Sequence, residues 1–158
     1  MKTFHSRTIS QIGQAAVELA MMAPVLLLIL LTIIDFGRVM YFYMGVVGAA
    51  RAGAQYGSQS TSTAADTAGM ISAALANAPQ GITMNTPTAS EICQCANGTV
   101  LSCGPPLTAS GGGAIPSGCS DIRIYVKVQT SGTFQTLFNY YLIPNTVNLT
   151  GLSQMRAQ

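Results

Sequence analysis

Four cysteines, Cys93, Cys95, Cys103 and Cys119, are the residues whose types and spacing are best suited to chemistry. In an oxidising compartment they predict two disulfides, which is the leading interpretation. A Cys93–Cys95 bond would be strained within a strand, so each of these two is expected to bond to Cys103 or Cys119. Both connectivities that satisfy this condition stay open. Zinc binding by the four cysteines and redox catalysis by Cys93 and Cys95 are the rival interpretations, but the spacing of the cysteines fits no common zinc motif.

Acid–base catalysis has few candidate residues. The one histidine, His5, lies close to the N-terminus, and Asp66, Glu91 and Asp121 lack the spacing of paired catalytic carboxylates. Serines and threonines are numerous but have no candidate base. We therefore expect no enzyme, no catalytic residue, no cofactor and no metal. A secreted enzyme that depends on free thiols is the catalytic alternative.

One acidic residue stands at the start of a long apolar run. Glu18 directly precedes residues 19–34, which carry no charge. An ionised carboxylate in hydrocarbon costs several kcal/mol unless it is paired. One interpretation places Glu18 among the lipid headgroups, where the dipole of a helix start favours it. The other interpretation gives it a cationic partner.

The composition agrees with a membrane-associated or exported chain. Of the 158 residues, 49% are hydrophobic and only 8% are charged, about a third of the usual share. The seven Lys and Arg are spread along the sequence, so we expect no basic stripe and no nucleic-acid partner. The apolar run and its neighbours predict a transmembrane span at about 15–36. Lys2 and Arg7 precede the span and predict a cytoplasmic N-terminus.

The helical pattern continues beyond this span and predicts one helix over residues 14–57. Within it, Asp35 and Arg38 have the spacing of an ion pair. Pro24 predicts either a kink or a proline tolerated in a membrane helix. A cleaved secretory signal is the alternative, although no small-x-small site follows the run.

The residues around Glu18 resemble a known family. Gly13 lies five positions earlier, after a short basic leader, and the stretch GQAAVE continues to the pair Ala23-Pro24 and the motif DFGR at 35–38. This sequence resembles the TadE-like pseudopilin, or minor pilin, family of tight-adherence (Flp) pilus systems over residues 10–57. The resemblance implies that a prepilin peptidase removes the leader, residues 1–13, after Gly13. It also implies that the new α-ammonium of Gln14 is accepted by Glu18 of a neighbouring subunit.

Residues 58–158 are expected to form an exported α+β head. A capping box at Thr63 and Asp66 predicts a short second helix that ends before Pro79, and residues 79–90 read as a loop. Its core face is expected to consist of Ala64, Ala68, Ile71 and Leu75.

A small antiparallel sheet is expected to follow. Strands at 92–96 and 99–103 flank a two-residue turn at Asn97-Gly98, which would set Cys95 opposite Val100. Gly151 reads as a bulge or a packing point in the last strand. The remaining segments are a flexible loop at 107–118, the clearest strand at 121–129, a packed aromatic loop at 134–144 and a final strand at 147–157.

Together these features predict a single-pass protein with its C-terminal head outside, and the resemblance implies that the membrane is the bacterial inner membrane and the head is periplasmic. The resemblance implies a minor pilin-like subunit that acts in assembly or display of a Flp pilus, either at the membrane or within an extracellular fibre. Its expected partners are the prepilin peptidase, other pilins and pseudopilins through the N-terminal helix, the pilus secretion machinery and the bilayer. The alternative is an anchored, exported binding module that never enters a fibre.

Overall fold

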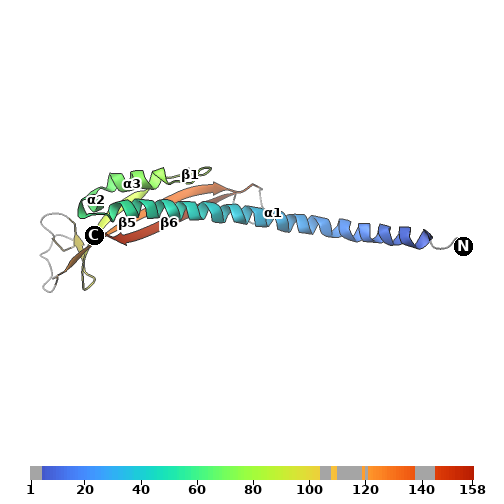
Figure 1. Ribbon diagram of the computed structural model, residues 1–158, viewed down its shortest axis with the longest axis horizontal. Helices are drawn as coiled ribbons and strands as arrows, with labels where there is room; N and C mark the ends of the chain where they lie inside the picture. Colours follow the sequence, from blue (N-terminus) through green and yellow to red (C-terminus); the bar gives the residue numbers. More distant parts are fainter. Residues whose placement is uncertain (1–4, 104–107, 110–118, 120, 138–144) are drawn as a thin grey trace. The chain divides into compact units, whose positions relative to one another are not determined.

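The computed structural model describes residues 5–103, 108–109, 119, 121–137 and 145–158, with side chains for all of these but 5–12 and 108–109 (Figure 1). The chain divides into two compact units, residues 1–38 and 39–158, and we call the second the head unit. The head unit holds part of a long helix, two short helices and an antiparallel sheet. The expected α+β class is confirmed.

The long helix α1 runs over His5–Gly57. Its end agrees with the prediction, but its start lies nine residues before residue 14. Residues 5–12 contain neither glycine nor proline, so nothing in the leader stops the helix. Most of the large apolar side chains between Val17 and Ile34 are exposed. Residues 39–57 of the same helix belong to the head unit.

Two short helices follow α1 where one was predicted: α2 over Thr61–Ala65 and α3 over Thr67–Ala76. The predicted capping box at Thr63 and Asp66 is wrong. The capping box joins Ser60 and Thr63, since Ser60 Oγ accepts from the Thr63 amide at 3.2 Å and Thr63 Oγ1 accepts from the Ser60 amide at 3.0 Å. Asp66 ends α2 and caps α3, so the helix breaks there.

The buried face of α3 also differs from the prediction. Met70 and Ala74 are fully buried and pack in the main core cluster. Because the break at Asp66 restarts the helix, a periodicity counted across it does not hold. Of the four residues predicted for this face, Ala64 is buried and Ile71 is half-buried, whereas Ala68 and Leu75 are exposed.

The sheet has one central strand, β5. β6 pairs along one edge of β5, β2 and β1 pair along the other, and β3 and β4 continue beyond β2. All pairs are antiparallel, and part of the region predicted as a loop at 79–90 is strand. The strands are β1 (Thr83–Met84), β2 (Thr88–Cys95), β3 (Val100–Ser102), β4 (Thr108–Ala109), β5 (Ile122–Gln135) and β6 (Thr146–Arg156).

The β2–β3 hairpin has a register one residue away from the predicted one. Val100 lies opposite Gln94, not Cys95. The loop has three residues, 96–98, rather than two, and it is closed by a bond of 2.9 Å from the Cys95 amide to the Thr99 carbonyl. Gly98 adopts a φ of +92° at the end of this loop. A positive φ at the third loop position is typical of such hairpins, and the extra residue shifts the register.

The alternation predicted for 121–129 is confirmed, and it continues six residues further to Gln135. Alternate residues from Val126 to Phe134 are buried and form the inner face of the sheet. The helices of the head unit cover this inner face (Figure 1). The opposite, outer face carries the intervening side chains of β5 and their neighbours on β2 and β6.

The last strand agrees with its prediction within one residue and places Gly151 as a packing point. A side chain there would approach the carbonyl oxygen of Val46 in α1 to 2.8 Å, so the helix backbone passes directly over it. Phe134 and Gln135 are strand residues rather than loop. The predicted loops at 138–144 and 110–118 lie outside the described residues, and Thr108–Ala109 is the strand β4.

Candidate functional site

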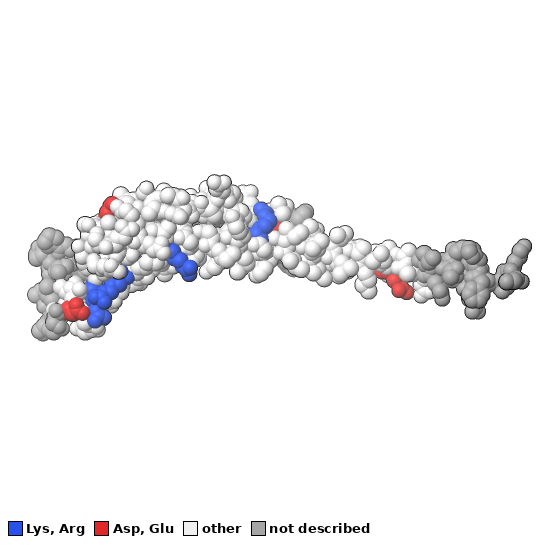
Figure 2. Space-filling view, viewed as in Figure 1, with Lys and Arg blue, Asp and Glu red and all other residues white. Residues whose placement is uncertain are grey.

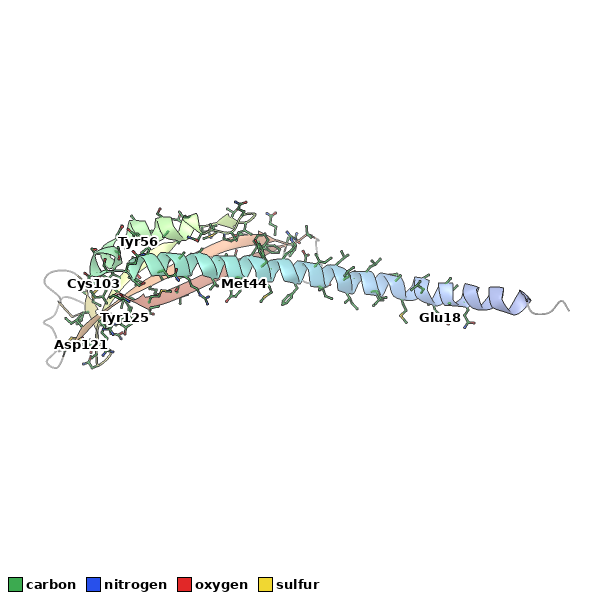
Figure 3. The ribbon with its side chains drawn as sticks, viewed as in Figure 1. Glu18, Met44, Tyr56, Cys103, Asp121 and Tyr125 are labelled. Atoms are coloured by element: carbon green, nitrogen blue, oxygen red, sulfur yellow. A yellow bond between two sulfur atoms is a disulfide. The ribbon has the colours of Figure 1, made fainter. Side chains whose placement is uncertain are left out.

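The residues implied in processing and assembly lie close together on the exposed N-terminal part of α1. Gln14 and Glu18 are one helical turn apart, and the Gln14 side-chain amide donates a hydrogen bond of 3.3 Å to Glu18 Oε1. Both side chains are exposed in the single chain. Figure 3 shows Glu18 projecting from the helix surface. The Glu18 carboxylate can therefore accept a further donor from outside the chain.

Gly13 lies within α1 and not in an extended segment. Open space surrounds it, because no heavy atom outside the helix lies within 4 Å of a side chain built there. A protease that cleaves after Gly13 needs an extended backbone and must first unwind this part of the helix. Glycine lowers the cost of that step, since it is about 1 kcal/mol less favourable in a helix than alanine.

The helix continues without a break across Pro24. A locally opened helix at this position was one of the predicted alternatives, and a tolerated proline was the other. Further along, the Arg38 Nη1 and Asp35 Oδ1 atoms lie 3.0 Å apart, so the predicted pair is confirmed. Among the described residues, α1 from Gly13 to Gly57 is long and apolar enough to cross a membrane.

The four cysteines form two disulfides, as predicted. Cys93 is bonded to Cys103 and Cys95 to Cys119, with Cα–Cα distances of 5.4 and 5.3 Å. Cys93 and Cys95 lie on the inner face of β2, and both are buried with Leu101. The sequence left the connectivity open, and the register of β2 and β3 decides it.

A carboxylate lies next to one of these disulfides. An oxygen of Glu91 and the sulfurs of Cys93 and Cys103 lie within 4.8 Å of one another. The two sulfurs are bonded together and offer no thiolate, so this group presents a metal with a single carboxylate oxygen. Both cysteines of this group are therefore bonded to each other and carry no free thiol.

Tyr56 and Asp66 form a polar contact that the sequence analysis missed. The Tyr56 hydroxyl donates to Asp66 Oδ2 at 2.8 Å, while Asp66 Oδ1 accepts from the Gly69 amide at 2.9 Å. The hydrogen bond from the Gly69 backbone amide, and after it the hydrogen bond from the Tyr56 hydroxyl, lower the pKa of Asp66. Its carboxylate raises the pKa of Tyr56. The cap at Asp66 was visible in the sequence, but its tertiary partner ten residues earlier had no local signal.

A second feature missed in the sequence is a group of cations on the outer face of the sheet. Arg123 and Lys127 flank Tyr125 on β5, and Arg156 of β6 lies directly opposite Tyr125. Arg123 Nε lies 3.1 Å from Asp121 Oδ2, and this pairing raises the pKa of Arg123. The sequence analysis noted only that the basic residues are spread along the sequence and did not predict that these three lie together. Alternation within a strand gave the face of each residue, but only the β5–β6 register brings Arg156 to it.

One comparison with known proteins agrees with the description of the N-terminal helix. Residues 13–55 match the family described as TadE-like protein. The match contains Gly13, Gln14, Glu18 and Pro24 and confirms the resemblance to the TadE-like family over this segment. It supports a Tad pilus-associated membrane protein with an N-terminal apolar helix, in a family of structural proteins. No curated protein and no solved structure matches the chain.

Proposed function

We infer that this chain is a minor pilin-like subunit that acts in assembly or display of a tight-adherence pilus. The observation that carries the proposal is the TadE-like match, whose residues 13–55 include every residue of the exposed apolar helix start. The large apolar surface between Val17 and Ile34 suits a bilayer before assembly and other pilin helices afterwards. The membrane is the bacterial inner membrane, with the N-terminus in the cytoplasm and the head in the periplasm.

Processing is the first step of the proposed mechanism. A prepilin peptidase cleaves the bond between Gly13 and Gln14, removes the basic leader and leaves an α-ammonium on Gln14. That ammonium has an ordinary pKa near 7.7–8.0 and is largely protonated at neutral pH. The catalytic residues belong to the peptidase, and this chain is its substrate.

Assembly uses the group that processing exposes. Glu18 of one subunit accepts the α-ammonium of a neighbour's Gln14, so two charges that are costly in an apolar environment satisfy one another. The side-chain amide of Gln14 donates a hydrogen bond to Glu18 Oε1, but this bond is long, at 3.3 Å, and lies on an exposed surface. A charged donor replaces it readily.

Mass spectrometry of the mature N-terminus tests the processing step. With the peptidase present, we expect the chain to begin at Gln14, and Gly13→Leu to keep the intact leader because the side chain obstructs the protease cleft. Gly37→Leu is the matched control, since Gly37 lies in the same helix with the same open surroundings. An uncleaved parent, or a cut after residue 34, would instead support an anchored module outside any fibre.

Recovery of the chain in sheared pili tests the assembly step. Glu18→Gln keeps the size of the side chain and removes its charge, so we expect normal cleavage but at least a tenfold loss from the fibre fraction. Gln14→Ala removes the amide and keeps the α-ammonium, so it should assemble like the parent. Full assembly of Glu18→Gln and Glu18→Ala would refute the pairing.

A further inference from the structure

The outer face of the sheet concentrates the positive charge of the head unit. Arg123, Lys127 and Arg156 surround Tyr125, and we call these four residues the cationic face. The only other Lys or Arg in residues 39–158 is Arg51, on α1. Figure 2 shows one group of Lys and Arg side chains beside an acidic residue, with other Lys or Arg side chains standing apart from it, and Figure 3 shows Tyr125 and Asp121 near one another.

Uncharged polar groups surround the cations. A hollow of about 180 Å³ beside Lys127 is lined by Thr88, Ala89, Ser90 and Gln129. Gln154 of β6 lies opposite Lys127 on the other side, and Gln94 of β2 lies opposite Arg123. These amides and hydroxyls both donate and accept hydrogen bonds, as the hydroxyl groups of a sugar require.

Among the described residues, the head of a second copy offers no group of carboxylates to match this face. The head has three acidic residues, Asp66, Glu91 and Asp121. Asp66 is held by Tyr56, and Glu91 stands opposite Val126 on the inner side of the sheet. Asp121 already belongs to the region of the cationic face, where it pairs with Arg123. The complementary charge must come from another molecule.

The cationic face lies at one end of the head unit. The Gln158 amide donates to the Ser58 carbonyl, so the cationic face lies beside the C-terminal end of α1. Val39, where the head unit begins, is roughly 27 Å away along this helix. Within the head unit, Val39 and the cationic face therefore lie at opposite ends of residues 39–57 of α1.

The spacing of the cations selects an extended ligand with several charges. Arg123 and Lys127 are four residues apart on β5, which is roughly 13 Å. A single small anion meets one of them, whereas a chain with regularly repeated carboxylates meets both and Arg156 as well. The flat ring of Tyr125 lies between them, where a sugar ring can rest on it. We propose that the cationic face binds an acidic, carboxylate-bearing polysaccharide.

Each residue of the face has a distinct part in this binding. The guanidinium groups of Arg123 and Arg156 offer two parallel donors to a carboxylate, and Lys127 offers a compact charge. Asp121 competes with the ligand, because its carboxylate lies 3.1 Å from Arg123. Removal of the Asp121 charge should therefore strengthen binding.

The test measures binding of the full chain, in micelles of an uncharged detergent, to polygalacturonate, to neutral dextran and to a short DNA duplex. We expect polygalacturonate to bind, dextran not to bind, and the affinity to fall as salt increases. Lys127→Gln with Arg156→Gln should weaken binding at least tenfold, and Asp121→Asn should strengthen it about twofold. Arg51→Gln, which removes an exposed charge outside the face, should leave it unchanged.

Tyr125→Leu separates sugar recognition from plain charge attraction. It should weaken binding to polygalacturonate about threefold and leave any attraction to DNA unchanged. The proposal is overturned by absence of binding to polygalacturonate, by an equal loss in Arg51→Gln, or by DNA binding as tightly as the polysaccharide. Because no fibre or peptidase is involved, each of these outcomes leaves the proposed role in pilus assembly standing.

Discussion

The hydroxyl of Thr130, in the middle of β5, donates a hydrogen bond of 2.8 Å to the main-chain carbonyl oxygen of Val46 in α1. Both residues are buried, and they are 84 positions apart in the sequence. Gly151 of β6 lies at the same point and lets the helix backbone approach the sheet. This contact fixes the height of α1 on the inner face of the head unit.

Thr130→Val tests this contact with little change of volume. The substitution removes the donor, and we expect it to lower the free energy of unfolding by about 1–2 kcal/mol. Urea unfolding of the full chain in micelles, followed by tyrosine fluorescence, measures the change. Thr133→Val is the control on the outer side of the same strand, where the hydroxyl makes an exposed bond of 3.3 Å to Asn148, and it should cost less than about 0.5 kcal/mol. Equal losses would contradict the assigned role.

Two glycines of α1 should respond in opposite directions to the same substitution. A side chain at Gly53 would lie 2.7 Å from the carbonyl oxygen of Met70, whereas Gly48 has nothing within 4 Å. Gly53→Ala should therefore destabilise the chain by about 1–3 kcal/mol because the helices must separate. Gly48→Ala should stabilise it by about 0.5–1 kcal/mol through helix propensity. Thermal unfolding compares the two, and a stabilising Gly53→Ala would disprove the close packing of α1 on α3.

The two disulfides should contribute unequally to stability. The Cys93–Cys103 bond closes a sequence separation of 10 residues and the Cys95–Cys119 bond one of 24. On the chain-entropy model, removing them costs about 2.7 and 3.4 kcal/mol respectively. Unfolding of the two double alanine variants in urea measures the difference.

The connectivity is checked on the unreduced protein. Peptide mapping should recover one linked peptide pair that contains Cys93 and Cys103 and another that contains Cys95 and Cys119. Thiol titration without reductant should find no free thiol. Recovery of the crossed pairs would refute the register of β2 and β3, because that register places the cysteines.

The contact between Tyr56 and Asp66 predicts a pH dependence at both ends of the scale. The folded-state pKa of Asp66 is lowered from 3.8, so its stabilising effect is present above that value and lost as the pH falls through the folded pKa. The pKa of Tyr56 is raised from 10.0, so its contribution is present below pH 10 and lost as the pH rises through the folded pKa.

Asp66→Asn and Tyr56→Phe test the two coupled effects. Asparagine keeps the helix cap, so Asp66→Asn should flatten the acid side of the stability profile relative to the parent. It should flatten the alkaline side as well, because the Asp66 carboxylate is what raises the pKa of Tyr56. Tyr56→Phe should flatten the alkaline side and keep most of the acid side, because the Gly69 amide still donates to Asp66. The measurement is the free energy of unfolding of each full chain from about pH 2 to 11. Parallel profiles for parent and variants would show that this contact does not couple folding to protonation.

Local patterns in the sequence predicted the parts of the fold that depend on near neighbours. The strand containing Val126 and Val128 alternates clearly, and α1 ends at Gly57 as its small residues and the polar segment after it indicate. The predicted strand ends at Gln129, yet β5 continues through Thr130, Ser131 and Gly132 because β6 pairs with every residue there. Tertiary pairing overrides local preference in this case.

The disulfides and the cationic face could be predicted only in part for the same reason. Both depend on registers between strands, and one positive φ at Gly98 is enough to change a register by one residue. The N-terminal site differs, since Gly13, Gln14 and Glu18 lie within one short segment. Their spacing is visible in the sequence, and their partners are in other molecules.

The close passage of α1 over Gly151 bears on how the head unit withstands mechanical tension. A pull on residues 39–57 reaches the sheet through Val46, Thr130 and Gly151, that is, into the middle of β5 and β6. These two strands are paired from Tyr125↔Arg156 to Gln135↔Thr146 without interruption. Tension along the helix is therefore applied to the middle of a long strand pair, where many hydrogen bonds between β5 and β6 must break together. Tension applied at the end of the pair would break them one after another.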